Sequence, residues 1–591
     1  MSDYRAPVKD MRFVINELAE LEKIAGLPGY EEATPDMVEA VLEGAAQLAS
    51  EVIAPTNAIG DEQGARVENG QVIVPPEFHT AYKQYVEDGW PGIGFNPEFG
   101  GQGLPALMAV AVEEMLQSAN LAWSLCPMLT HGAIHALESH GSDALKAIYL
   151  EKMIAGEWTG TMNLTEPQAG SDLSVVRSSA VPDGDAWKVS GQKIFITWGD
   201  HDITENVIHL VLARTPDAPA GVKGLSLFIV PKFLVNEDSS LGERNTVTTV
   251  SLEHKLGIHG SPTCVLDFEN ATGYLIGAEG DGLACMFTMM NSARLGVGLE
   301  GVSVAERSYQ HALAYALERV QGRAPGHDGN VAIVEHPDVR RMLLTMKAEV
   351  EAMRAVAYVA NGHLDQAERN EDAEQQAFHK ARVDLLTPIV KGWITERAQE
   401  LTSLGLQVHG GMGYVEESGA AQYMRDARIL TIYEGTTGIQ AGDLIGRKVL
   451  RDKGLTLQKL LDEINAVAGS LDGELADIAT ALAMAVEDAK ASLTWLLEHH
   501  ASDPTIPGGV SYHFLMLLGT LCGGWQMARS AKVAREKLTG GDADTDFYNA
   551  KILSAKFYVE QTLPKVAAHS RSVKSGSATM MAFTLDQLRG E

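Results

Sequence analysis

The spacing of apolar residues divides the chain into a helical part, a β-rich part and a second helical part. Helical spacing predicts helices within residues 11–48 and over Ala106–Ala119, on either side of the glycine- and proline-rich loop Pro91–Pro105. Short strand-like segments bounded by Asp, Gly and Pro begin near Gly160: TGTMNL, AWKVSGQKIFIT, VIHLVLAR, GLSLFIVPKF, NTVTTVSL and TCVLDFE. This spacing predicts a β-barrel or sandwich of about a hundred residues.

Helical spacing returns after Gly282. The sequence predicts helices over 284–323, 339–364 and 374–401, another after Thr437, and a last helical region over 455–588. We therefore expect an α+β multidomain protein, because 591 residues are too many for one core. The predicted parts are an N-terminal helical domain (1–159), a middle β-domain (160–280), a second helical domain (281–450) and a C-terminal helical extension (451–591).

The charge balance excludes one class of partner. The chain has 47 Lys and Arg against 78 Asp and Glu, a formal net charge of −31. A surface this acidic repels phosphate backbones, so we expect no nucleic acid partner. No CxxC or Cys/His spacing relates the four cysteines, so we expect no metal site. Neither a membrane-length apolar run nor a targeting segment is recognised, and a cytoplasmic location without membrane contact is the expectation.

A glutamate on a short turn is a candidate catalytic base. In the segment Met424–Gln440 (MRDARILTIYEGTTGIQ), Glu434 follows a tyrosine and precedes Gly-Thr-Thr-Gly. A carboxylate on such a turn is held in place without belonging to a helix face, which suits removal of one particular proton. Taken alone, the segment fits a solvated loop glutamate better.

Two segments of the β-rich part contain polar and aromatic residues that could bind a ligand. In TMNLTEPQAGSD a strand runs into a Pro/Gly turn, where N–H groups and the hydroxyls of Thr165 and Ser171 could hold a polar ring edge or a phosphate. In GQKIFITWGD, Phe195 and Thr197 share one face of a strand and could flank a flat heterocycle. The simpler interpretations are that the first segment is only the entry to a loop and that Phe195 is buried in the barrel.

Two arginines and a glycine-rich turn stand out in the second helical part. Arg294 lies among small residues in NSARLGVG, at the predicted start of a helix, and Arg319 lies near the end of that helix, where a cation complements the dipole. QVHGGMGY is a weak phosphate-loop signal. No GxGxxG with a following acid appears, so we expect no nicotinamide site.

The order of these motifs resembles the acyl-CoA dehydrogenase family of flavoproteins. The matching segments are PEFGGQGL, NLTEPQAGSD, GQKIFIT, HKLGIHGSPTC, LIGAEGDGLACM, ARLGVGLEG, ALER, QVHGGMGY and MRDARILTIYEGTTGIQ. They follow the family's order over roughly residues 40–447, and nine segments in order are far more specific than one. The resemblance implies the family's fold, with an N-terminal helical domain, a middle β-barrel and a helical bundle, here followed by an extra C-terminal helical domain.

The resemblance implies an enzyme that uses FAD to dehydrogenate a short-chain acyl-CoA thioester. Glu434 would remove the α-proton while a hydride passes from the β-carbon to flavin N5, with hydrogen bonds stabilising the charge on the thioester oxygen. Some family members carry the base on the helix that here holds 291–294, and this stretch has no carboxylate. The implied FAD contacts are Met162, Leu164, Thr165, Gly170, Ser171, Phe195, Ile196, Thr197, Arg319, Gln321, Gln407, Gly410, Gly411, Thr436 and Gly438. The implied substrate contacts are Ser171, Arg294, Gly435 and Arg447.

The sequence departs from the family pattern in two places. The family often has Arg-x-x-Phe-Gly where this chain has Arg319-Val-Gln-Gly, one residue shorter and without the aromatic side chain. The family often has an arginine twelve residues after the base, whereas Arg447 is thirteen residues after Glu434. Both departures concern the cofactor tail and the CoA moiety.

Other activities within the superfamily share these motifs. A general short- or medium-chain fatty acyl-CoA dehydrogenase is the main alternative, and an acyl-CoA oxidase is another. A DNA-associated flavoprotein should have a basic C-terminal domain, but acids outnumber bases slightly here. The resemblance further implies an electron-transfer flavoprotein as electron acceptor and, because of the C-terminal extension, a homodimer.

Overall fold

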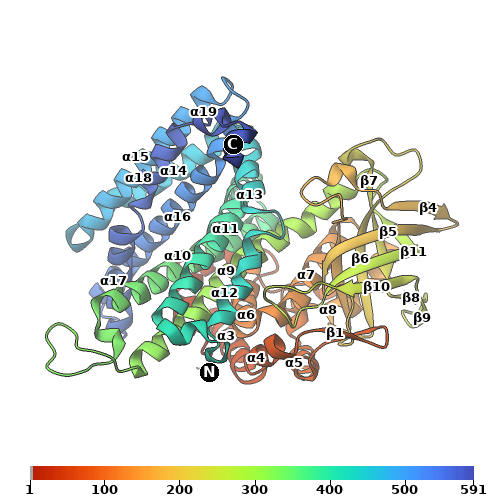
Figure 1. The fold of residues 1–591 in the computed structure, drawn as a ribbon, viewed down its shortest axis with the longest axis horizontal. Coiled ribbons are helices and arrows are strands. Elements are labelled where there is room, and N and C mark those ends of the chain that lie inside the picture. The colour runs from red at the N-terminus through yellow and green to blue at the C-terminus, as the bar shows by residue number, and fades with distance from the viewer. Residues whose placement is uncertain (1–3, 591) are drawn as a thin grey trace. The chain divides into compact units, whose positions relative to one another are not determined.

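The computed structural model describes residues 4–590, which form two compact units (Figure 1). Unit 1 contains residues 7–39 and 297–590, and unit 2 contains residues 4–6 and 40–296. The chain passes between the units within α3 (Pro35–Gln47) and α9 (Gly282–Glu318). The segments of the β-rich part that resemble the acyl-CoA dehydrogenase family therefore belong to unit 2, and the segment around Glu434 belongs to unit 1.

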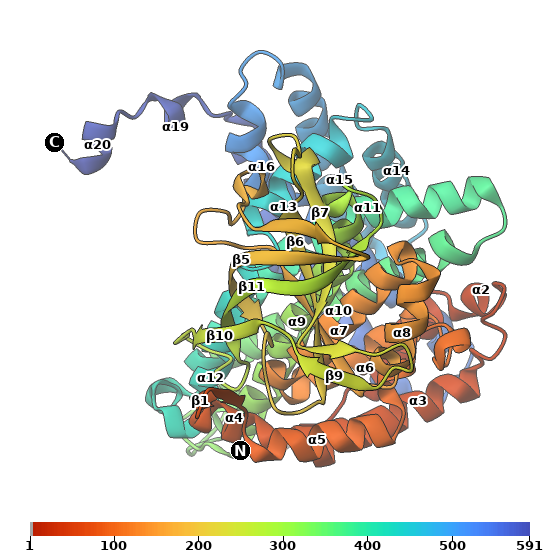
Figure 2. The ribbon, with the colours of Figure 1, turned by 90° about the vertical axis from the view of Figure 1, so that its right-hand side faces the viewer.

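Unit 2 contains a seven-stranded sheet (Figure 2). Its strands are β3 (Trp158–Asn163), β4 (Ser179–Asp183), β5 (Ala186–Thr197), β6 (Asn206–Arg214), β7 (Leu225–Pro231), β10 (Val247–Leu252) and β11 (Thr263–Ile276). The strand order is β10-β11-β5-β4-β6-β3, and β7 pairs with both β11 and β6. The pairs β11–β5–β4–β6–β7 therefore close into a ring, as the predicted β-barrel requires.

The interior of this ring is apolar. Strand side chains alternate between the two faces, and the inward residues meet in one core that includes Val189, Ile196, Val211, Phe228 and Leu266. Strands β6 and β7 are buried along nearly their whole length. The core fixes the strand register, because a slip by one residue would turn these side chains outward.

Helices and two small hairpins complete unit 2. The helices are α4 (Thr56–Gln63), α5 (Pro76–Glu87), α6 (Ala106–Ala119), α7 (Leu121–His140) and α8 (Asp143–Ile154), and the hairpins are β1 (Arg66–Glu68) with β2 (Gln71–Ile73) and β8 (Phe233–Val235) with β9 (Leu241–Arg244). Helix α6 has the predicted bounds. It ends at Ala119, and the side chain of the next residue, Asn120, accepts from the N–H of Trp123 at 3.1 Å and so caps α7.

Unit 1 is a helical bundle with an extension. Its helices besides α3 and α9 are α1 (Val8–Phe13), α2 (Leu21–Ala25), α10 (Pro337–Arg369), α11 (Ala373–Val408), α12 (Ala420–Ala427), α13 (Thr437–Asp443), α14 (Leu455–Gly469), α15 (Ala476–His499), α16 (Ile506–Thr539), α17 (Thr545–Gln561), α18 (Lys565–Lys574), α19 (Ala578–Ala582) and α20 (Leu585–Arg589). Helices α10 and α11 pack along each other, and α16 packs against both. Figure 2 shows α19 and α20 extending away from the other helices of the extension.

Helix α16 is the core helix of the extension. By length and composition alone it could cross a membrane, but 72% of its most apolar window is buried. Gly519 lets α16 approach α11 closely, because a Cβ there would lie 2.1 Å from the Trp393 side chain. The hydroxyl of Tyr558 in α17 donates to the Thr520 carbonyl at 3.0 Å. Packing within the bundle accounts for the apolar character of α16.

Buried ion pairs join the N-terminal segment to the C-terminal extension. Asp10 in α1 accepts from Arg354 in α10 and from Lys551 in α17. Arg354 also binds Glu306 at 2.8 Å, and Lys551 also binds Glu351 at 3.2 Å. Burial alone would raise the pKa of Asp10, but Lys551 and Arg354 hold this pKa well below its ordinary value. Helices α1 and α17, from opposite ends of the sequence, are thereby both fixed to α10.

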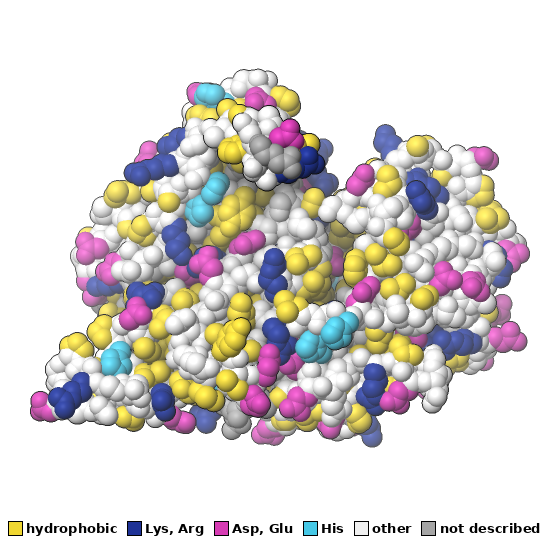
Figure 3. Space-filling model, in the orientation of Figure 1, with side chains coloured by type: hydrophobic (Ala, Val, Ile, Leu, Met, Phe, Trp, Pro, Cys, Tyr) yellow, Lys and Arg dark blue, Asp and Glu magenta, His cyan; other side chains and the backbone are white. Residues whose placement is uncertain are grey.

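Charged side chains are dispersed over the face shown in Figure 3, with acidic and basic groups interspersed. The view shows no continuous basic area of the kind that binds a phosphate backbone.

Candidate functional site

In unit 2 a buried lysine fixes the turn after β3 to strand β5. The Nζ of Lys193 donates to the Leu164 carbonyl at 3.0 Å and to Glu166 Oε1 at 2.9 Å. The N–H of Ile194 donates to the Thr165 carbonyl at 2.9 Å. Lys193 and Glu166 are both buried. Two of the segments recognised in the sequence therefore form one rigid element of unit 2.

Glu166 organises this turn. Its carboxylate also accepts from the Ser178 hydroxyl at 2.6 Å, the Ser178 N–H at 3.0 Å and the Arg177 N–H at 2.7 Å. Burial alone would raise the pKa of Glu166, but the Lys193 ammonium and these hydrogen bonds lower it to about 2. Neither Glu166 nor Lys193 was predicted from the sequence as a site residue. An acid and a lysine inside the two recognised motifs were the signal that could have found them.

Phe195 has an unusual conformation for a strand residue. Its φ is +60°, and its side chain is 59% exposed. Ile196 pairs with Cys264 and Lys193 pairs with Leu266, so two residues of β5 oppose one of β11 in a β-bulge. A left-handed backbone at a non-glycine residue costs about 1–2 kcal/mol. Residues in such strained conformations persist only where the surrounding structure imposes them, and they cluster at functional sites.

The other predicted residues of unit 2 differ in accessibility. Met162, Thr165 and Thr197 are half-buried, Gly170 and Ser171 are exposed, and Leu164 and Ile196 are buried. Arg294 is buried in α9, with its guanidinium 6.0 Å from the ring centre of Phe287. The predicted position of Arg294 at the start of a helix is wrong, because α9 begins at Gly282, about three turns earlier.

In unit 1, Glu434 lies in a bend between the 3-10 turn Arg428–Thr431 and α13. Its backbone is left-handed, with φ +54°. Lys391 of α11 donates through Nζ to the carbonyls of Leu430 at 2.8 Å and Gly435 at 2.7 Å. Gln440 of α13 donates through Nε2 to the carbonyls of Glu434 at 3.1 Å and Gly435 at 3.3 Å. Two side chains thus hold the main chain around the predicted base.

The residues next to Glu434 are also held by side chains from distant helices. The hydroxyl of Tyr433 donates to Glu300 of α9, and both burial and Glu300 raise the pKa of Tyr433 well above its ordinary value. The hydroxyl of Thr437 donates to Glu396 at 2.6 Å, while Thr436 caps α13. The sequence did not predict these four side chains as site residues: Lys391, Gln440, Glu300 and Glu396. Lys391 had one sequence signal, a cation inside the apolar run TPIVKGWI.

A second group of predicted residues lies where α9 and α11 end. Tyr315 and His409 stack with ring centres 4.5 Å apart, which brings the two helix ends together. Arg319 and Gln321 follow α9, with 3.5 Å between Arg319 Nη2 and Gln321 Oε1. The remaining members are Gln407, Gly410 and Gly411, and all five predicted residues are exposed. No atom lies within 4 Å of a Cβ built on either glycine, so the backbone is open to a ligand.

Arg447 lies in the π-helical turn Leu444–Val449 that continues α13. Its side chain is 57% exposed and pairs with Asp443 at 2.7 Å. A π-helical turn accommodates one residue more than an α-helical turn. The extra residue between Glu434 and Arg447 therefore has a local structural cause.

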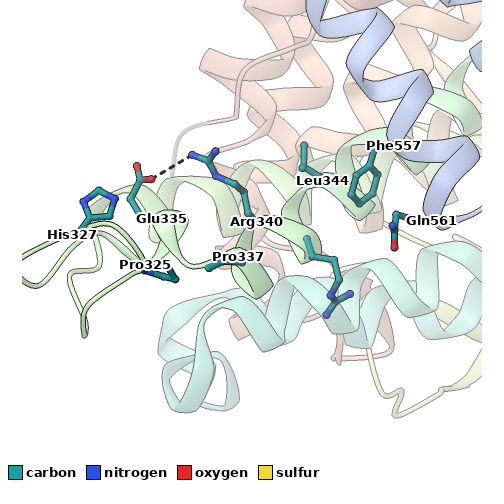
Figure 4. A pocket seen from close by; sticks show the side chains of 9 residues that line it. Pro325, His327, Glu335, Pro337, Arg340, Leu344, Phe557 and Gln561 are labelled. Atoms are coloured by element: carbon teal, nitrogen blue, oxygen red, sulfur yellow. Dashed lines mark hydrogen bonds and ion pairs between the residues drawn. The ribbon is translucent and has the colours of Figure 1, made fainter. Parts of the chain in front are cut away.

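A pocket of about 510 Å³ in unit 1 is separate from these residues (Figure 4). Its lining includes His327, Glu335, Arg340 and Leu344, together with Phe557 and Gln561 of α17. Glu335 and Arg340 pair at 3.5 Å across the lining. None of the predicted site residues lines this pocket, so we do not assign it to the reaction. Among residues 4–590 no group of three or more His, Cys, Asp or Glu side chains is arranged to hold a metal ion.

Comparison with known sequences defines the class of protein. The acyl-CoA dehydrogenase N-terminal domain matches residues 35–157, the middle domain residues 161–271 and the C-terminal domain residues 280–450. A further domain described as acetyl-CoA dehydrogenase C-terminal like matches residues 460–584. The chain therefore belongs to the acyl-CoA dehydrogenase family and is an FAD-dependent enzyme that acts on acyl-CoA.

Individual relatives are similar along almost the whole chain. A 3-methylmercaptopropionyl-CoA dehydrogenase from Ruegeria pomeroyi is 50% identical over 98% of this chain and 99% of that protein. A butyryl-CoA dehydrogenase from Syntrophomonas wolfei is 34% identical over 98% of each chain. The solved structure of an acyl-CoA dehydrogenase from Bacillus anthracis, complexed with FAD, has a TM-score of 0.74 at 20% identity and covers 94% of this chain and 90% of that one.

The residues of each unit fit FAD. Unit 2 offers the exposed ring of Phe195 beside a turn with hydroxyl groups and main-chain donors, which suits a flat heterocycle. Unit 1 offers the exposed Arg319 near two glycines whose backbone is open, which suits a pyrophosphate and its charge.

Proposed function

We propose that the enzyme dehydrogenates 3-methylmercaptopropionyl-CoA to methylthioacryloyl-CoA in dimethylsulfoniopropionate demethylation. The observation that carries this proposal is the 50% identity, over 98% of the chain, to a relative that bears the name of this activity. The new double bond would conjugate with the thioether sulfur, which favours the product. We also propose that the four predicted domains meet near residues 159, 280 and 450.

Glu434 acts as the base in this proposal. Its carboxylate removes the α-proton of the thioester, while its main-chain N–H donates to the thioester oxygen, where negative charge develops. FAD, when bound, accepts the two electrons that leave with the β-hydrogen. Lys391 and Gln440 hold the main chain of the turn, so the carboxylate meets the α-carbon in one orientation.

The remaining predicted residues bind the two ligands. Phe195 packs on the flavin ring, and Thr197 and the turn after β3 supply polar contacts to it. Arg319 and Gln407 bind the adenosine and pyrophosphate part of FAD. The other proposed FAD contacts are Met162, Leu164, Thr165, Gly170, Ser171, Ile196, Gln321, Gly410, Gly411, Thr436 and Gly438. Ser171, Arg294, Gly435 and Arg447 contact the acyl-CoA.

We propose a cytoplasmic homodimer that passes its electrons to an electron-transfer flavoprotein. Exposed apolar side chains around Arg319 support the dimer: Leu317, Val320, Met412 and Tyr414, of which Tyr414 is 88% exposed. Contiguous exposed apolar residues of this kind mark protein interfaces. Sedimentation at micromolar concentration tests the dimer, and reduction of a purified electron-transfer flavoprotein tests the acceptor.

A general short- or medium-chain fatty acyl-CoA dehydrogenase is the second candidate. The similarity to a butyryl-CoA dehydrogenase, 34% identity over 98% of each chain, favours it. Both candidates use the same base and cofactor, and they differ in the acyl chain that the pocket accepts.

Anaerobic titration with three thioesters separates these candidates. The FAD-loaded enzyme is titrated with 3-methylmercaptopropionyl-CoA, butyryl-CoA and octanoyl-CoA while flavin absorbance is followed. Preferential bleaching by the thioether substrate over both fatty acyl thioesters supports the first proposal. Preference for butyryl-CoA or octanoyl-CoA would instead indicate a general fatty acyl-CoA enzyme.

A further inference from the structure

We propose that Lys391 is a positioning residue for the reaction: its buried ammonium sets the orientation of Glu434 by holding the main chain on both sides of it. This inference rests on the proposed role of Glu434 as the base. Lys391 lies in α11, more than forty residues before Glu434 in the sequence.

The two hydrogen bonds from Lys391 bracket the base. One bond, 2.8 Å long, ends on the carbonyl of Leu430, four residues before Glu434, and the other, 2.7 Å long, ends on the carbonyl of Gly435. Fixing both ends of such a short bend leaves the residue between them few alternative backbone conformations. The left-handed backbone at Glu434, φ +54°, is costly and persists only if its surroundings impose it.

The chemistry of Lys391 argues against a residue retained for packing alone. Its side chain is fully buried, and a buried ammonium is expensive unless strong acceptors surround it. Charge-assisted bonds to main-chain carbonyls are about twice as strong as neutral ones, so the ammonium is a stiff anchor for the turn. An apolar residue of the same length would fill the space but could not hold either carbonyl.

Gln440 and Tyr433 hold the turn in a different way from Lys391. Gln440 also reaches the Gly435 carbonyl, but at 3.3 Å and through a neutral amide. Tyr433 is bound to Glu300 through its side chain, which fixes the residue before the base and not the main chain after it. Among these contacts Lys391 alone joins the segment before Glu434 to the segment after it.

The test is Lys391→Met in the FAD-loaded enzyme, compared with wild type and with Glu434→Gln. We expect flavin bleaching at saturating butyryl-CoA to slow by about 10- to 100-fold, since misplacing a reacting group by about 1 Å has effects of this size. Thioester Kd should change by less than about threefold. Exchange of the α-protons of acetyl-CoA in D2O should slow in parallel, because acetyl-CoA has no β-carbon to oxidise and reports proton removal alone.

Lys551→Met is the matched control, because it removes another buried lysine of unit 1 that contacts no residue of the turn. It should lower thermal stability and leave α-proton exchange unchanged. If Lys391→Met does not fold, Lys391→Gln, which keeps an N–H donor without the charge, should show an intermediate loss. Wild-type exchange in a folded Lys391 variant would overturn the inference, and so would a loss of affinity or stability without a slower bleaching rate. Normal turnover by Glu434→Gln would instead refute the base assignment, so the two failures are distinguishable.

Discussion

Phe195 combines two features that rarely occur in one residue, a left-handed backbone and an exposed aromatic side chain. Glycine would relieve the backbone cost while removing few packing contacts. Phe195→Gly should therefore leave the free energy of unfolding unchanged or raise it by up to about 1 kcal/mol. If the ring packs on the flavin, the same variant should bind FAD about tenfold more weakly, the scale of one lost stacking contact. Urea unfolding of the apoenzyme and FAD titration measure the two effects separately.

Trp198 provides the control for this prediction. It has the same left-handed backbone, with φ +52°, but its side chain is 1% exposed, and its indole N–H donates to the Ala122 carbonyl at 3.0 Å. Trp198→Gly should destabilise the protein by roughly 3–5 kcal/mol. A similar loss of stability for Phe195→Gly would show that the phenylalanine has a structural role and contradict the assignment to FAD.

At the residue scale the sequence predicted which side chains belong to recognised motifs but not what holds them. Glu434 and Phe195 were identified because their motifs are local in sequence. Lys391 and Glu300 were missed, because their contacts with the Glu434 turn cross more than forty and more than a hundred residues of sequence. Such contacts depend on how helices pack, and no spacing pattern encodes them.

The turn after β3 and strand β5 form an element whose rigidity depends on one buried ion pair. Glu166→Gln should lower the free energy of unfolding by about 3 kcal/mol at pH 7, because it leaves Lys193 buried without its counter-charge. The pKa of Glu166 is lowered from 4.5 to about 2 in the folded protein. Because the pKa is lower in the folded protein, the ionised carboxylate stabilises the folded state above pH 4.5. This stabilisation is lost as the pH falls from 4.5 toward 2.

Urea unfolding at several pH values checks this prediction. The difference between wild type and Glu166→Gln should narrow as the pH is lowered from about 5 to about 3. Asp183→Asn, a change of the same kind at the exposed end of β4, should have no measurable effect. A difference independent of pH would mean that packing, and not charge, explains the loss.

Most elements were predictable because their periodicity is strong. The predicted segment AWKVSGQKIFIT has the bounds of β5, and the predicted helix over 284–323 starts two residues late and overruns α9 by five. Strand β4 (SAVPD) was missed, because a proline and exposed polar residues obscure its alternation. The stretch over 11–48 is helical but interrupted, since Glu20 adopts a left-handed backbone at the start of α2. The strands that pair to close the sheet could not be predicted, because pairing partners are set by tertiary packing.

At the scale of the whole molecule, the N-terminal segment and the C-terminal extension depend on each other through Asp10. Asp10→Asn should cost about 3–5 kcal/mol of stability, because two buried cations lose their shared counter-charge. Lys9→Met is the control, since the Lys9–Asp544 pair joins the same two segments but its side chains are 65% and 41% exposed. It should cost less than about 1 kcal/mol. Urea unfolding followed by circular dichroism compares the two variants, and equal effects would contradict a role for the buried charges.

Glu434→Gln is the sharpest test of the proposal that Glu434 removes the α-proton of an acyl-CoA thioester. The variant should retain its FAD and bind butyryl-CoA with little change, but anaerobic flavin bleaching should slow by about a thousandfold, within the range for loss of a general base. Glu417→Gln, an exposed glutamate of unit 1 outside the turn, should bleach like wild type. Bleaching of Glu434→Gln at the wild-type rate would exclude Glu434 as the base that removes the α-proton.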